Sequence, residues 1–303
     1  MKVGFVIPVH NRRETTLRAL GTLTRIDRRG LDLRVFVVDD GSRDGTSDAV
    51  RAAFPDVQIL QGDGTLHYAA GTNMGLRAAL DWGARHVVAA NDDSIFHADA
   101  LQRLVATAEA TPRAVVGALL LRWDQPHRVF QVAPQWDLWY GGWRLPESLT
   151  AFSVPDRPFD VELVVGNCVL IPAEAMRAHG LLDAANFRHG WGDAQFTMRL
   201  RRAGWRLVVD PRARVWCEPN TNPPPLATLT AGELARVLLV NERHPMNLKR
   251  QFVARWHSAP SKPQAVAAFG VFFTRLMLKG LGIGEPWPAW PDPAPRWQVP
   301  VGA

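Results

Sequence analysis

The chain has 303 residues, of which 47% are hydrophobic and 21% are charged. This ordinary globular composition excludes an intrinsically disordered chain and leaves enough apolar material for one large domain or two modest ones. The formal charge of +6 suits anionic partners such as phosphates, nucleic acid or an acidic membrane surface, and it does not choose among them.

Cysteine usage and hydropathy both point to a cytoplasmic protein. Cys168 and Cys217 lie far apart and match neither a disulfide framework nor a paired-cysteine zinc site, which favours a reducing compartment. The apolar run near the N-terminus is too short for a signal peptide, and no stretch approaches the roughly 18 apolar residues of a membrane-spanning helix.

The first hundred residues alternate short apolar runs with helical patterns, as strand–helix–strand units of a parallel sheet do. Strands are predicted at 3–9, 33–40, 57–60 and 86–92, and helices at 14–23 and 71–84. A polar cluster follows the carboxyl end of each strand, which is where open parallel sheets form their ligand crevice. These clusters are therefore expected to converge on one site.

The middle of the chain is less regular. Further strands are predicted at 114–122, 162–172 and 205–211, with helices at 173–180 and 193–204. The tryptophan-rich segment before residue 162 suggests loops or a small antiparallel excursion. The proline run within 218–226 marks a boundary, beyond which the sequence is arginine-rich and helical to about residue 284.

Four polar motifs each have an ordinary explanation when taken alone. "DDGSRDGT" (39–46) fits a turn, "GTNMG" (71–75) a capped helix start, and "GWGDAQF" (190–196) an acid facing a helix dipole. "NDD" (91–93) fits a solvated turn, although two adjacent ionised carboxylates repel and need water or a cation beside them. The order and spacing of the four motifs give them more weight.

In this order, "VIPVHNR", "VVDDGSRDGT", "GTNMG", "AANDDS" and "GWGDAQFTMRLRRAGWRL" resemble the motifs of the inverting glycosyltransferase family 2, and "GDGTLHYAAGTNMG" resembles its bacterial rhamnosyltransferase-like members. The resemblance covers about residues 3–220. It implies an α/β fold of GT-A type: a Rossmann-like, mostly parallel sheet with flanking helices, plus a C-terminal helical extension. The implied division is a nucleotide-sugar-binding half (1–110), an acceptor-binding half (111–220) and a basic helical extension (221–303).

The resemblance also implies a pocket for a nucleoside-diphosphate sugar. The residues that it assigns to this pocket are Pro8, Val9, Asn11, Asp39, Asp40, Ser42, Gly71, Asn73, Asn91 and Asp92. Asp39 would accept hydrogen bonds from the base or ribose, with Asp40 and Ser42 shaping the turn. Gly71 and Asn73 would let the backbone approach the diphosphate or sugar.

The acidic step stands where the family has its aspartate-any-aspartate motif. By this resemblance Asp93, with Asp92 beside it, holds Mg²⁺ or Mn²⁺ against the donor diphosphate, since hard oxygen ligands suit these cations. Many relatives carry an aspartate where this chain has Asn91, and an amide is a weaker ligand, so Asn91 is expected to orient a neighbour or the ribose. Glu218 in "VWCEPN" is a further candidate ligand or phosphate contact.

Asp193 is the candidate catalytic base, because the family has a glutamate–aspartate pair here and Gly192 replaces the glutamate. Burial beside Trp191 would raise the pKa of Asp193 and the helix N-terminus would lower it; the sequence leaves the balance open. Trp191 and His189 are candidate acceptor contacts.

These features predict a metal-dependent inverting glycosyltransferase that moves a sugar from a UDP- or dTDP-sugar, with dTDP-rhamnose among the candidates, to a hydroxyl of a glycan or glycolipid. The alternative is a catalytically inactive nucleotide-sugar-binding protein, prompted by Gly192 and Asn91. A nucleotidyltransferase ranks last, because "PVHNRRETT" lacks a glycine-rich loop.

The expected partners are the nucleotide sugar and a glycan or lipid-linked acceptor, with no nucleic acid. The basic helical segments at 241–256 and 271–282 resemble tails that act at the membrane surface, which would place the protein peripherally at the inner face of the cell membrane. Packing on the catalytic domain and formation of a homodimer are open alternatives.

Overall fold

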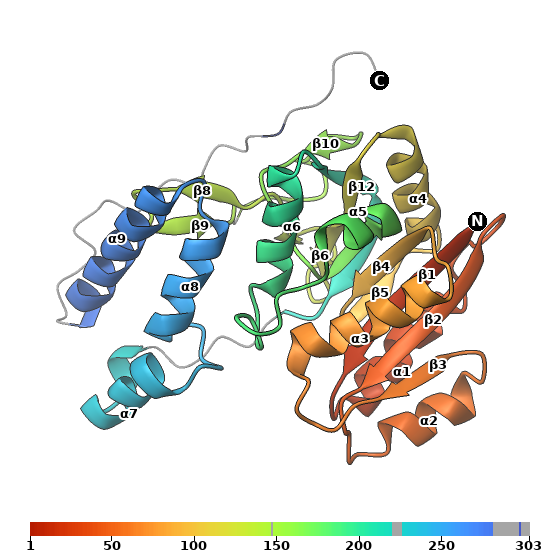
Figure 1. Cartoon of the computed structure of the whole chain (residues 1–303), viewed down its shortest axis with the longest axis horizontal. Helices are drawn as coiled ribbons and strands as arrows, with labels where there is room; N and C mark the ends of the chain where they lie inside the picture. The colour runs from red at the N-terminus through yellow and green to blue at the C-terminus, as the bar shows by residue number, and fades with distance from the viewer. Residues whose placement is uncertain (147, 220–225, 281–296, 298–303) are drawn as a thin grey trace. The chain divides into compact units, whose positions relative to one another are not determined.

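The computed structural model describes residues 1–303 except 147, 220–225, 281–296 and 298–303, so the predicted proline-rich boundary lies outside the described residues. The chain forms two compact units. The first comprises residues 1–133, 147–219 and 296–303, and the second comprises 134–146 and 220–295. Figure 1 shows the elements of both units.

The first unit is built on one ten-stranded sheet. Along the sheet the strands are β10 (Phe159–Asp160), β12 (Arg206–Cys217), β6 (Ala114–Arg122), β11 (Cys168–Pro172), β4 (His86–Ala90), β1 (Lys2–Val9), β2 (Asp32–Asp39) and β3 (Gln58–Gln61). Two short strands pair outside this order, β5 (Ser94–Phe96) with β12 and β7 (Val129–Gln131) with β6.

Most of these strands run in one direction. β1 pairs in parallel with β2 and β4, β2 with β3, and β6 with β12, whereas β11 runs antiparallel between β4 and β6. The carboxyl ends of β1, β2, β4, β6 and β12 therefore meet at one edge. The predicted α/β fold with a mostly parallel sheet is confirmed.

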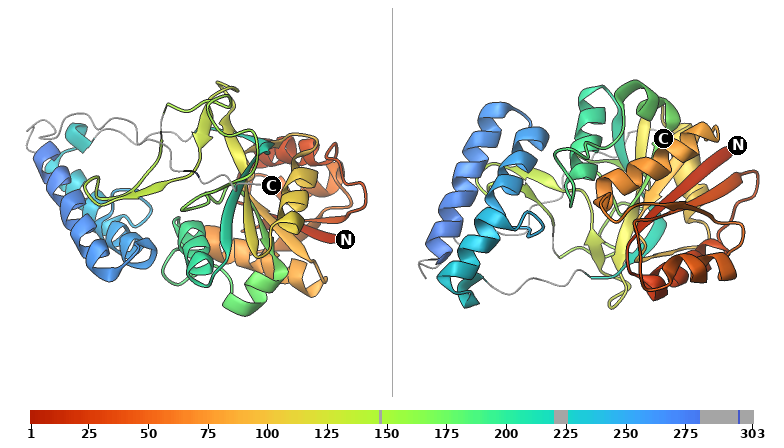
Figure 2. Two further views of the ribbon diagram at one scale, coloured as in Figure 1. Left: turned by 90° about the horizontal axis from the view of Figure 1, so that it is seen from above. Right: turned by 60° about the horizontal axis from the view of Figure 1, so that its bottom comes forward.

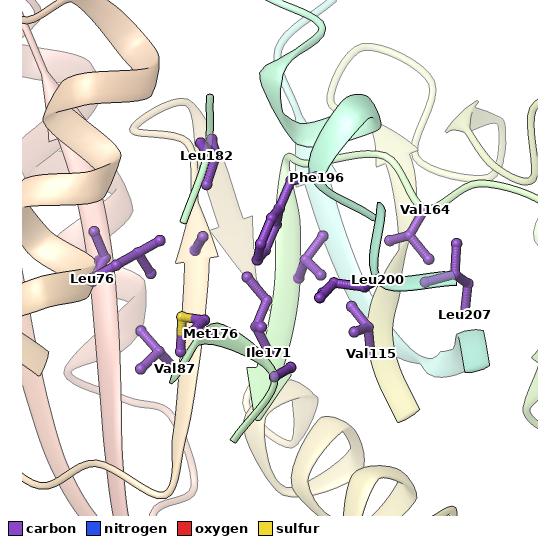
Figure 3. Packing of buried hydrophobic residues seen from close by; sticks show 14 of the residues in the cluster. Leu76, Val87, Val115, Val164, Ile171, Met176, Leu182, Phe196, Leu200 and Leu207 are labelled. Atoms are coloured by element: carbon purple, nitrogen blue, oxygen red, sulfur yellow. The ribbon is translucent and has the colours of Figure 1, made fainter. Parts of the chain in front are cut away.

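Helices cover both faces of this sheet. They are α1 (Arg13–Leu23), α2 (Thr46–Ala53), α3 (His67–Asp81), α4 (Ala100–Ala110), α5 (Ala173–His179) and α6 (Gly192–Arg202). Leu76 of α3, Met176 of α5 and Phe196 of α6 belong to the core on one face (Figure 3), while Leu20 of α1 and Leu101 of α4 belong to the core on the other. Both faces are covered, which explains why the strands read as continuous apolar runs.

Helix α3 packs closely on the sheet because a glycine faces it. A Cβ built on Gly75 would lie 2.3 Å from Cγ1 of Val6 in β1, so any larger residue would push the helix away. Gly71 lies one turn earlier on the same side, with Cβ of Pro8 3.6 Å from the corresponding position. The glycines of "GTNMG" thus set the distance between α3 and the ends of β1 and β2.

Three element boundaries differ from the sequence prediction. Helix α3 begins at His67, four residues before the predicted start at 71. The predicted strand 162–172 pairs only from Cys168, and the amide of Gly166 binds a side chain instead of a neighbouring strand. The strand predicted at 205–211 continues to Cys217, because its second half pairs with both β5 and β6.

The second unit joins two distant segments of the chain. Its elements are β8 (Gln135–Asp137), β9 (Gly142–Arg144), the 3-10 helix η1 (Leu226–Thr228), α7 (Ala231–Ala235), the π-helix η2 (Arg236–Val240), α8 (Leu248–Ser258) and α9 (Lys262–Gly280). The β8–β9 hairpin is the antiparallel excursion that the sequence suggests, and it packs on the two long helices (Figure 2). Nε1 of Trp143 donates to Oγ of Ser258 at 2.8 Å, and Nε of Arg255 donates to the Gly141 carbonyl at 2.6 Å.

The predicted helical tail is present as far as residue 280, and its remainder to 284 lies outside the described residues. Among the helices that the structure describes, none combines the length and apolarity needed to cross a membrane.

Candidate active site

The loops after β1 and β2 are joined by side-chain hydrogen bonds. The Asn11 amide donates to Oγ of Ser42 at 2.8 Å, and the Arg43 amide donates to Oδ1 of Asn11 at 2.8 Å. Asn11 takes a φ of +52°, a left-handed conformation that asparagine tolerates better than most residues. The two loops therefore form one frame beside Pro8 and Val9, at the edge where the strands end.

Asp39 and Asp40 shape this frame with their carboxylates. Asp39 is buried and accepts hydrogen bonds from the Ser42 amide at 2.8 Å and from the Ser47 hydroxyl. Asp40, also buried, accepts from the amides of Gly64 and His67 at 2.8 and 2.9 Å. Asp40 thus satisfies backbone donors before and at the start of α3, which explains why this helix begins earlier than its glycine–asparagine motif.

Asn73 connects α3 to the segment that leads into α6. Its Nδ2 donates to the Leu182 carbonyl at 2.8 Å, and its Oδ1 accepts from the Leu182 amide at 2.9 Å. The side chain is 4% exposed. Asn73 is therefore a buried positioning group, and a contact between it and a donor stays a prediction.

The acidic step follows the end of β4 and faces an arginine. Nε of Arg12 lies 3.4 Å from Oδ2 of Asp92, Nη1 lies 3.7 Å from Oδ2 of Asp93, and Nη2 lies 3.0 Å from Oε2 of Glu218. Glu218 comes directly after β12, and its amide donates to the Asp93 carbonyl at 3.3 Å. One guanidinium thus gathers three carboxylates from two strand ends.

The two aspartates are poorly compensated in this arrangement. Burial raises the pKa of Asp92 to about 7, although the charge of Arg12 opposes this effect. Burial also raises the pKa of Asp93, again against Arg12. Oδ2 of Asp92 and Oδ1 of Asp93 are buried without a hydrogen-bond partner among the described residues. Orphaned carboxylate oxygens of this kind fit a divalent cation, which takes one or two carboxylates together with substrate phosphates.

A cation here would still need ligands from elsewhere. In the described part of the chain, no three histidine, cysteine or acidic side chains are grouped closely enough to hold a metal ion by themselves. Oδ1 of Asn91 is also buried without a hydrogen-bond partner among those residues, so its amide can orient a neighbouring group. The acidic step is therefore a partial site that a bound diphosphate would complete.

Asp193 lies in the first turn of α6. Its Oδ2 accepts a hydrogen bond from the Gly166 amide at 2.8 Å, and a Cβ on Gly166 would lie 2.3 Å from that oxygen. Burial raises the pKa of Asp193, and hydrogen bonds from the Ala194 and Gly166 amides oppose the rise. Of the two effects that the sequence leaves open, burial is the larger. The carboxylate is held in a fixed position and takes up a proton more readily than a surface aspartate.

Tyr68 links the acidic step to Asp193. Burial raises the pKa of its hydroxyl, and the charges of Asp193 and Asp93 raise it further. The tyrosine therefore lies within electrostatic reach of both carboxylates. Beside it, the rings of His67 and His189 lie 4.3 Å apart between centroids, so the start of α3 contacts the loop before α6.

Three residues around this edge adopt a strained backbone conformation. Asn11, His67 and Trp191 have φ values of +52°, +55° and +66°. Such conformations cost on the order of 1–3 kcal/mol each and persist only where surrounding contacts fix them. They mark the loop after β1, the first residue of α3 and the loop before α6 as places where surrounding contacts fix the backbone.

A comparison with known proteins decides the family. The family model described as "Glycosyltransferase like family 2" matches residues 2–233. The chain belongs to glycosyltransferase family 2. The N-acetylglucosaminyl-diphospho-decaprenol L-rhamnosyltransferase of Mycobacterium tuberculosis is 27% identical over 234 residues, which cover 69% of this chain and 75% of the relative. The predicted membership is confirmed.

Solved structures of glycosyltransferases share the fold of this family 2 member. GalNAc-T7 with UDP, GalNAc and Mn²⁺ gives a TM-score of 0.61 at 14% identity over 93% of this chain, and the chain spans 57% of that protein. The mannosyltransferase PcManGT from Pyrobaculum calidifontis, with GDP-Man and Mn²⁺, gives a TM-score of 0.54 at 18% identity. The match covers 93% of this chain and 79% of the mannosyltransferase. TarS from S. aureus with UDP gives a TM-score of 0.54 at 12% identity, and the match covers 92% of this chain and 72% of TarS. The GT-A fold is thus confirmed.

In this family 2 glycosyltransferase, the predicted acids converge with residues that sequence reasoning did not select. Arg12, Tyr68, His67 and Gly166 contact or influence the candidate carboxylates. Arg12 directly follows "VHN", and Tyr68 lies in the segment that resembles rhamnosyltransferase-like members. The motifs contain Arg12, His67 and Tyr68 but not Gly166, and only the folded chain gives these residues partners.

Proposed function

We propose that this family 2 glycosyltransferase is an inverting enzyme that moves a sugar from a UDP- or dTDP-sugar to a hydroxyl of a glycan or glycolipid. The observation that carries the proposal is a pair of hydrogen bonds made by adjacent residues. The backbone amide of Asn91 donates to the Asn167 carbonyl at 3.1 Å, and the Gly166 amide donates to Oδ2 of Asp193 at 2.8 Å. This connection supports one site for the candidate metal ligand and the candidate base. The M. tuberculosis relative is named for L-rhamnosyl transfer and a lipid-linked sugar diphosphate, which makes dTDP-rhamnose the first donor to test.

Asp93, helped by Asp92, would hold Mg²⁺ or Mn²⁺. When bound, the cation would neutralise the charge that develops on the leaving diphosphate. The orphaned buried oxygens of the two aspartates support this assignment, and two of the similar structures contain Mn²⁺. Calorimetric titration with dTDP and UDP tests it: EDTA and Asp93→Asn should each weaken nucleotide binding. Equal affinity with and without metal would contradict the metal role and would support the interpretation of the acidic step as a solvated turn.

The donor would bind at the frame formed by the loops after β1 and β2. The proposed contacts are Pro8, Val9, Asn11, Asp39, Asp40, Ser42, Gly71, Asn73, Asn91 and Asp92. Residues 1–110 would form the donor half, and 111–220 the acceptor half with His189 and Trp191. The ring contact between His67 and His189 supports this arrangement, because it joins the two halves at the site.

Asp193 would act as the base in a single displacement. The acceptor oxygen forms a bond to the anomeric carbon as the bond to the nucleoside diphosphate breaks, and the acceptor proton passes to Asp193. Attack from the face opposite the leaving group inverts the anomeric centre. The raised pKa of Asp193 makes it a better proton acceptor than an exposed aspartate, and the Gly166 amide fixes its orientation.

A donor screen tests the enzyme activity directly. Purified protein is incubated with UDP- and dTDP-sugars and Mn²⁺, and release of the nucleoside diphosphate is followed with and without acceptor. Asp193→Asn should abolish turnover and keep nucleotide binding, while Asp183→Asn, an acid that caps the nearby loop through Asn186, serves as the matched control. Unchanged turnover in Asp193→Asn would exclude Asp193 as the base.

The second candidate function is nucleotide-sugar binding without catalysis. Two residues favour it: Gly192 stands where the family carries a glutamate, and Asn91 where many relatives carry an aspartate. Saturable binding of a nucleotide sugar, with no turnover of any donor in the presence of metal and acceptor, would select this alternative.

A further inference from the structure

The outward side of α9 has an unusual composition for a helix on a protein surface. Between Lys262 and Lys279, its exposed residues are Pro263, Val266, Ala267, Gly270, Phe273, Thr274 and Met277, and none of them is charged. Val266, Phe273 and Met277 follow the spacing of one helix face and are 55%, 39% and 37% exposed. A surface helix normally turns such a stripe inward and its charges outward.

The exposed stripe is distinct from the side of α9 that packs inside the second unit. The opposite side of α9 carries Ala265, Ala268 and Leu276, which are buried. Ala265 and Ala268 form a small core with Trp136 of the β8–β9 hairpin. Helix α9 therefore has one apolar side that packs inside the second unit and a second apolar side that is exposed.

Helix α8 extends the exposed apolar surface through a row of aromatic rings. Phe252, which is 36% exposed, stacks on Trp256 with centroids 5.8 Å apart and meets Phe269 edge-on at 5.3 Å. Phe269 in turn stacks near Phe273 at 6.4 Å. These rings connect the two helices, so the stripe and the aromatic row form one surface, which we call the α8–α9 face.

The helices α8 and α9 themselves carry charges of one sign, while the exposed acid Glu242, six residues before α8, pairs with Lys249 at 2.6 Å. Residues 243–284 contain no aspartate or glutamate, and the basic residues among them are Arg243, Lys249, Arg250, Arg255, Lys262, Arg275 and Lys279. Lys262 and Lys279 stand at the two ends of the uncharged stripe and are exposed. Nζ of Lys262 also lies 4.3 Å from the centre of the Trp256 ring. An apolar stripe with a lysine at each end fits a partner that has an apolar layer beneath an anionic surface.

We propose that the α8–α9 face docks on an anionic lipid bilayer, with the apolar stripe in the headgroup region and the lysines on the lipid phosphates. Amphipathic helices that lie in a membrane plane have this combination of apolar side chains and basic residues. The inference rests on the proposed function only for its purpose, which is to bring the enzyme to a lipid-linked acceptor.

A second copy of the chain is the competing occupant, and the charges argue against it. In a two-fold dimer the same surface meets itself, so Lys262 and Lys279 would approach a partner whose α8 and α9 carry the same basic residues and no acid. The repulsion would have to be offset by a small apolar area. An anionic lipid surface offers the opposite charge and needs no such compensation.

Liposome co-sedimentation of the full-length protein tests the proposal. Vesicles of pure phosphatidylcholine are compared with vesicles of equal parts phosphatidylcholine and phosphatidylglycerol. The protein should bind the anionic vesicles at least about tenfold more tightly, because the basic residues are attracted to a surface of net negative charge. Equal binding to both vesicle types, or no binding to either, would overturn the proposal.

Paired variants separate the apolar and basic contributions. Phe273→Ser with Met277→Ser, and Lys262→Gln with Lys279→Gln, should each reduce binding to anionic vesicles about tenfold. The matched controls are Phe152→Ser, an 87% exposed phenylalanine of the first unit, and Arg25→Gln with Arg28→Gln on its surface. Thermal melting of each variant verifies folding. The conservative variant Phe273→Leu keeps an apolar side chain and should bind like the wild type. Variants that bind like the wild type, or controls that lose binding equally, would contradict the assignment of this face.

Two further measurements distinguish the possible failures. Sedimentation velocity would reveal a dimer, and a dimer that dissociates in Phe273→Ser with Met277→Ser would assign the face to a second copy and overturn the lipid proposal. Hydrolysis of the donor in detergent-free solution needs no membrane, so it should be unchanged in all α8–α9 variants. Absence of hydrolysis in the wild type together with normal vesicle binding would refute the proposed function and leave the docking face standing.

Discussion

Arg12 and Glu218 are 206 positions apart in the chain, yet Nη2 of the arginine lies 3.0 Å from Oε2 of the glutamate. The same guanidinium also faces Asp92 and Asp93. The arginine directly follows the loop residue Asn11, and the glutamate directly follows β12. Their contact therefore joins the loop after β1 to the end of β12 beside the acidic step, and it places a permanent positive charge where a divalent cation is proposed to bind.

Arg12 is expected to compete with the metal. In Arg12→Met, the carboxylates lose the guanidinium charge, so at pH 8 Mn²⁺ alone should bind about tenfold more tightly, a change of about 1.4 kcal/mol. Electron paramagnetic resonance titration of free Mn²⁺ measures this without any donor or turnover. Arg13→Met, which removes the exposed neighbouring arginine, is the control and should leave the affinity unchanged. Weaker Mn²⁺ binding in Arg12→Met would show that the arginine organises the site instead of competing for it.

The pH dependence of turnover should report Asp193. Because burial raises its pKa above the usual 3.8, the carboxylate is protonated, and inactive as a base, at pH values where an exposed aspartate is ionised. Turnover at saturating Mn²⁺ should therefore fall as the pH decreases, with a midpoint clearly above 3.8. Asp193→Asn should be inactive over the whole pH range while it keeps nucleotide binding. A wild-type profile whose acidic midpoint lies at or below 3.8 would contradict a base of raised pKa.

Gly166 is expected to be required for the position of Asp193. In Gly166→Ala the new methyl group would lie 2.3 Å from Oδ2 of Asp193, so the carboxylate must move. A displacement of about 1 Å at a catalytic group reduces turnover about a hundredfold. Initial rates and nucleotide titration should show a fall in kcat with little change in nucleotide affinity.

Gly21→Ala provides the matched comparison for that substitution. Gly21 lies inside α1, and a Cβ there meets nothing within 4 Å. Alanine should raise the free energy of unfolding by about 0.5–1 kcal/mol and leave turnover unchanged. Equal kinetic losses in both variants would point to a general effect of the substitutions and away from the contact with Asp193.

Asn73 should matter for both stability and the acceptor side. Asn73→Ala leaves the amide and carbonyl of Leu182 unpaired in a buried environment, which should lower the free energy of unfolding by about 2–4 kcal/mol in urea denaturation. Hydrogen exchange should increase over residues 181–193, because Asn73 holds the segment before α6. Asn186→Ala, whose side chain bonds only within that loop, is the control and should cost well under half as much. A small loss in Asn73→Ala would mean that water replaces the lost bonds.

The sheet and the acids at its edge could be predicted because both depend on local sequence. Buried parallel strands read as apolar runs, and polar residues that follow them must emerge at the same edge. The start of α3 could not be predicted in this way. It is set by the carboxylate of Asp40, which binds the amides of Gly64 and His67 from a different loop.

The partners of the candidate acids could not be predicted from local sequence either. Arg12 reads as one of two adjacent arginines, and only folding shows that it faces three carboxylates while Arg13 is exposed. The strand predicted from residue 162 fails for a similar reason. An apolar run that includes Gly166 looks ready to pair, but the Gly166 amide donates to Asp193, a residue 27 positions later.

The β8–β9 hairpin has a consequence for the order in which the protein matures. Its tryptophans, Trp136 and Trp143, are covered by helices that begin more than a hundred residues later, at Leu248 and Lys262. During synthesis the indoles of the hairpin therefore stay exposed to solvent and to chaperones until α8 and α9 have left the ribosome. A protein cut short after the sheet domain would keep those tryptophans uncovered, so the C-terminal helices cannot be deleted cleanly without also replacing residues 134–146.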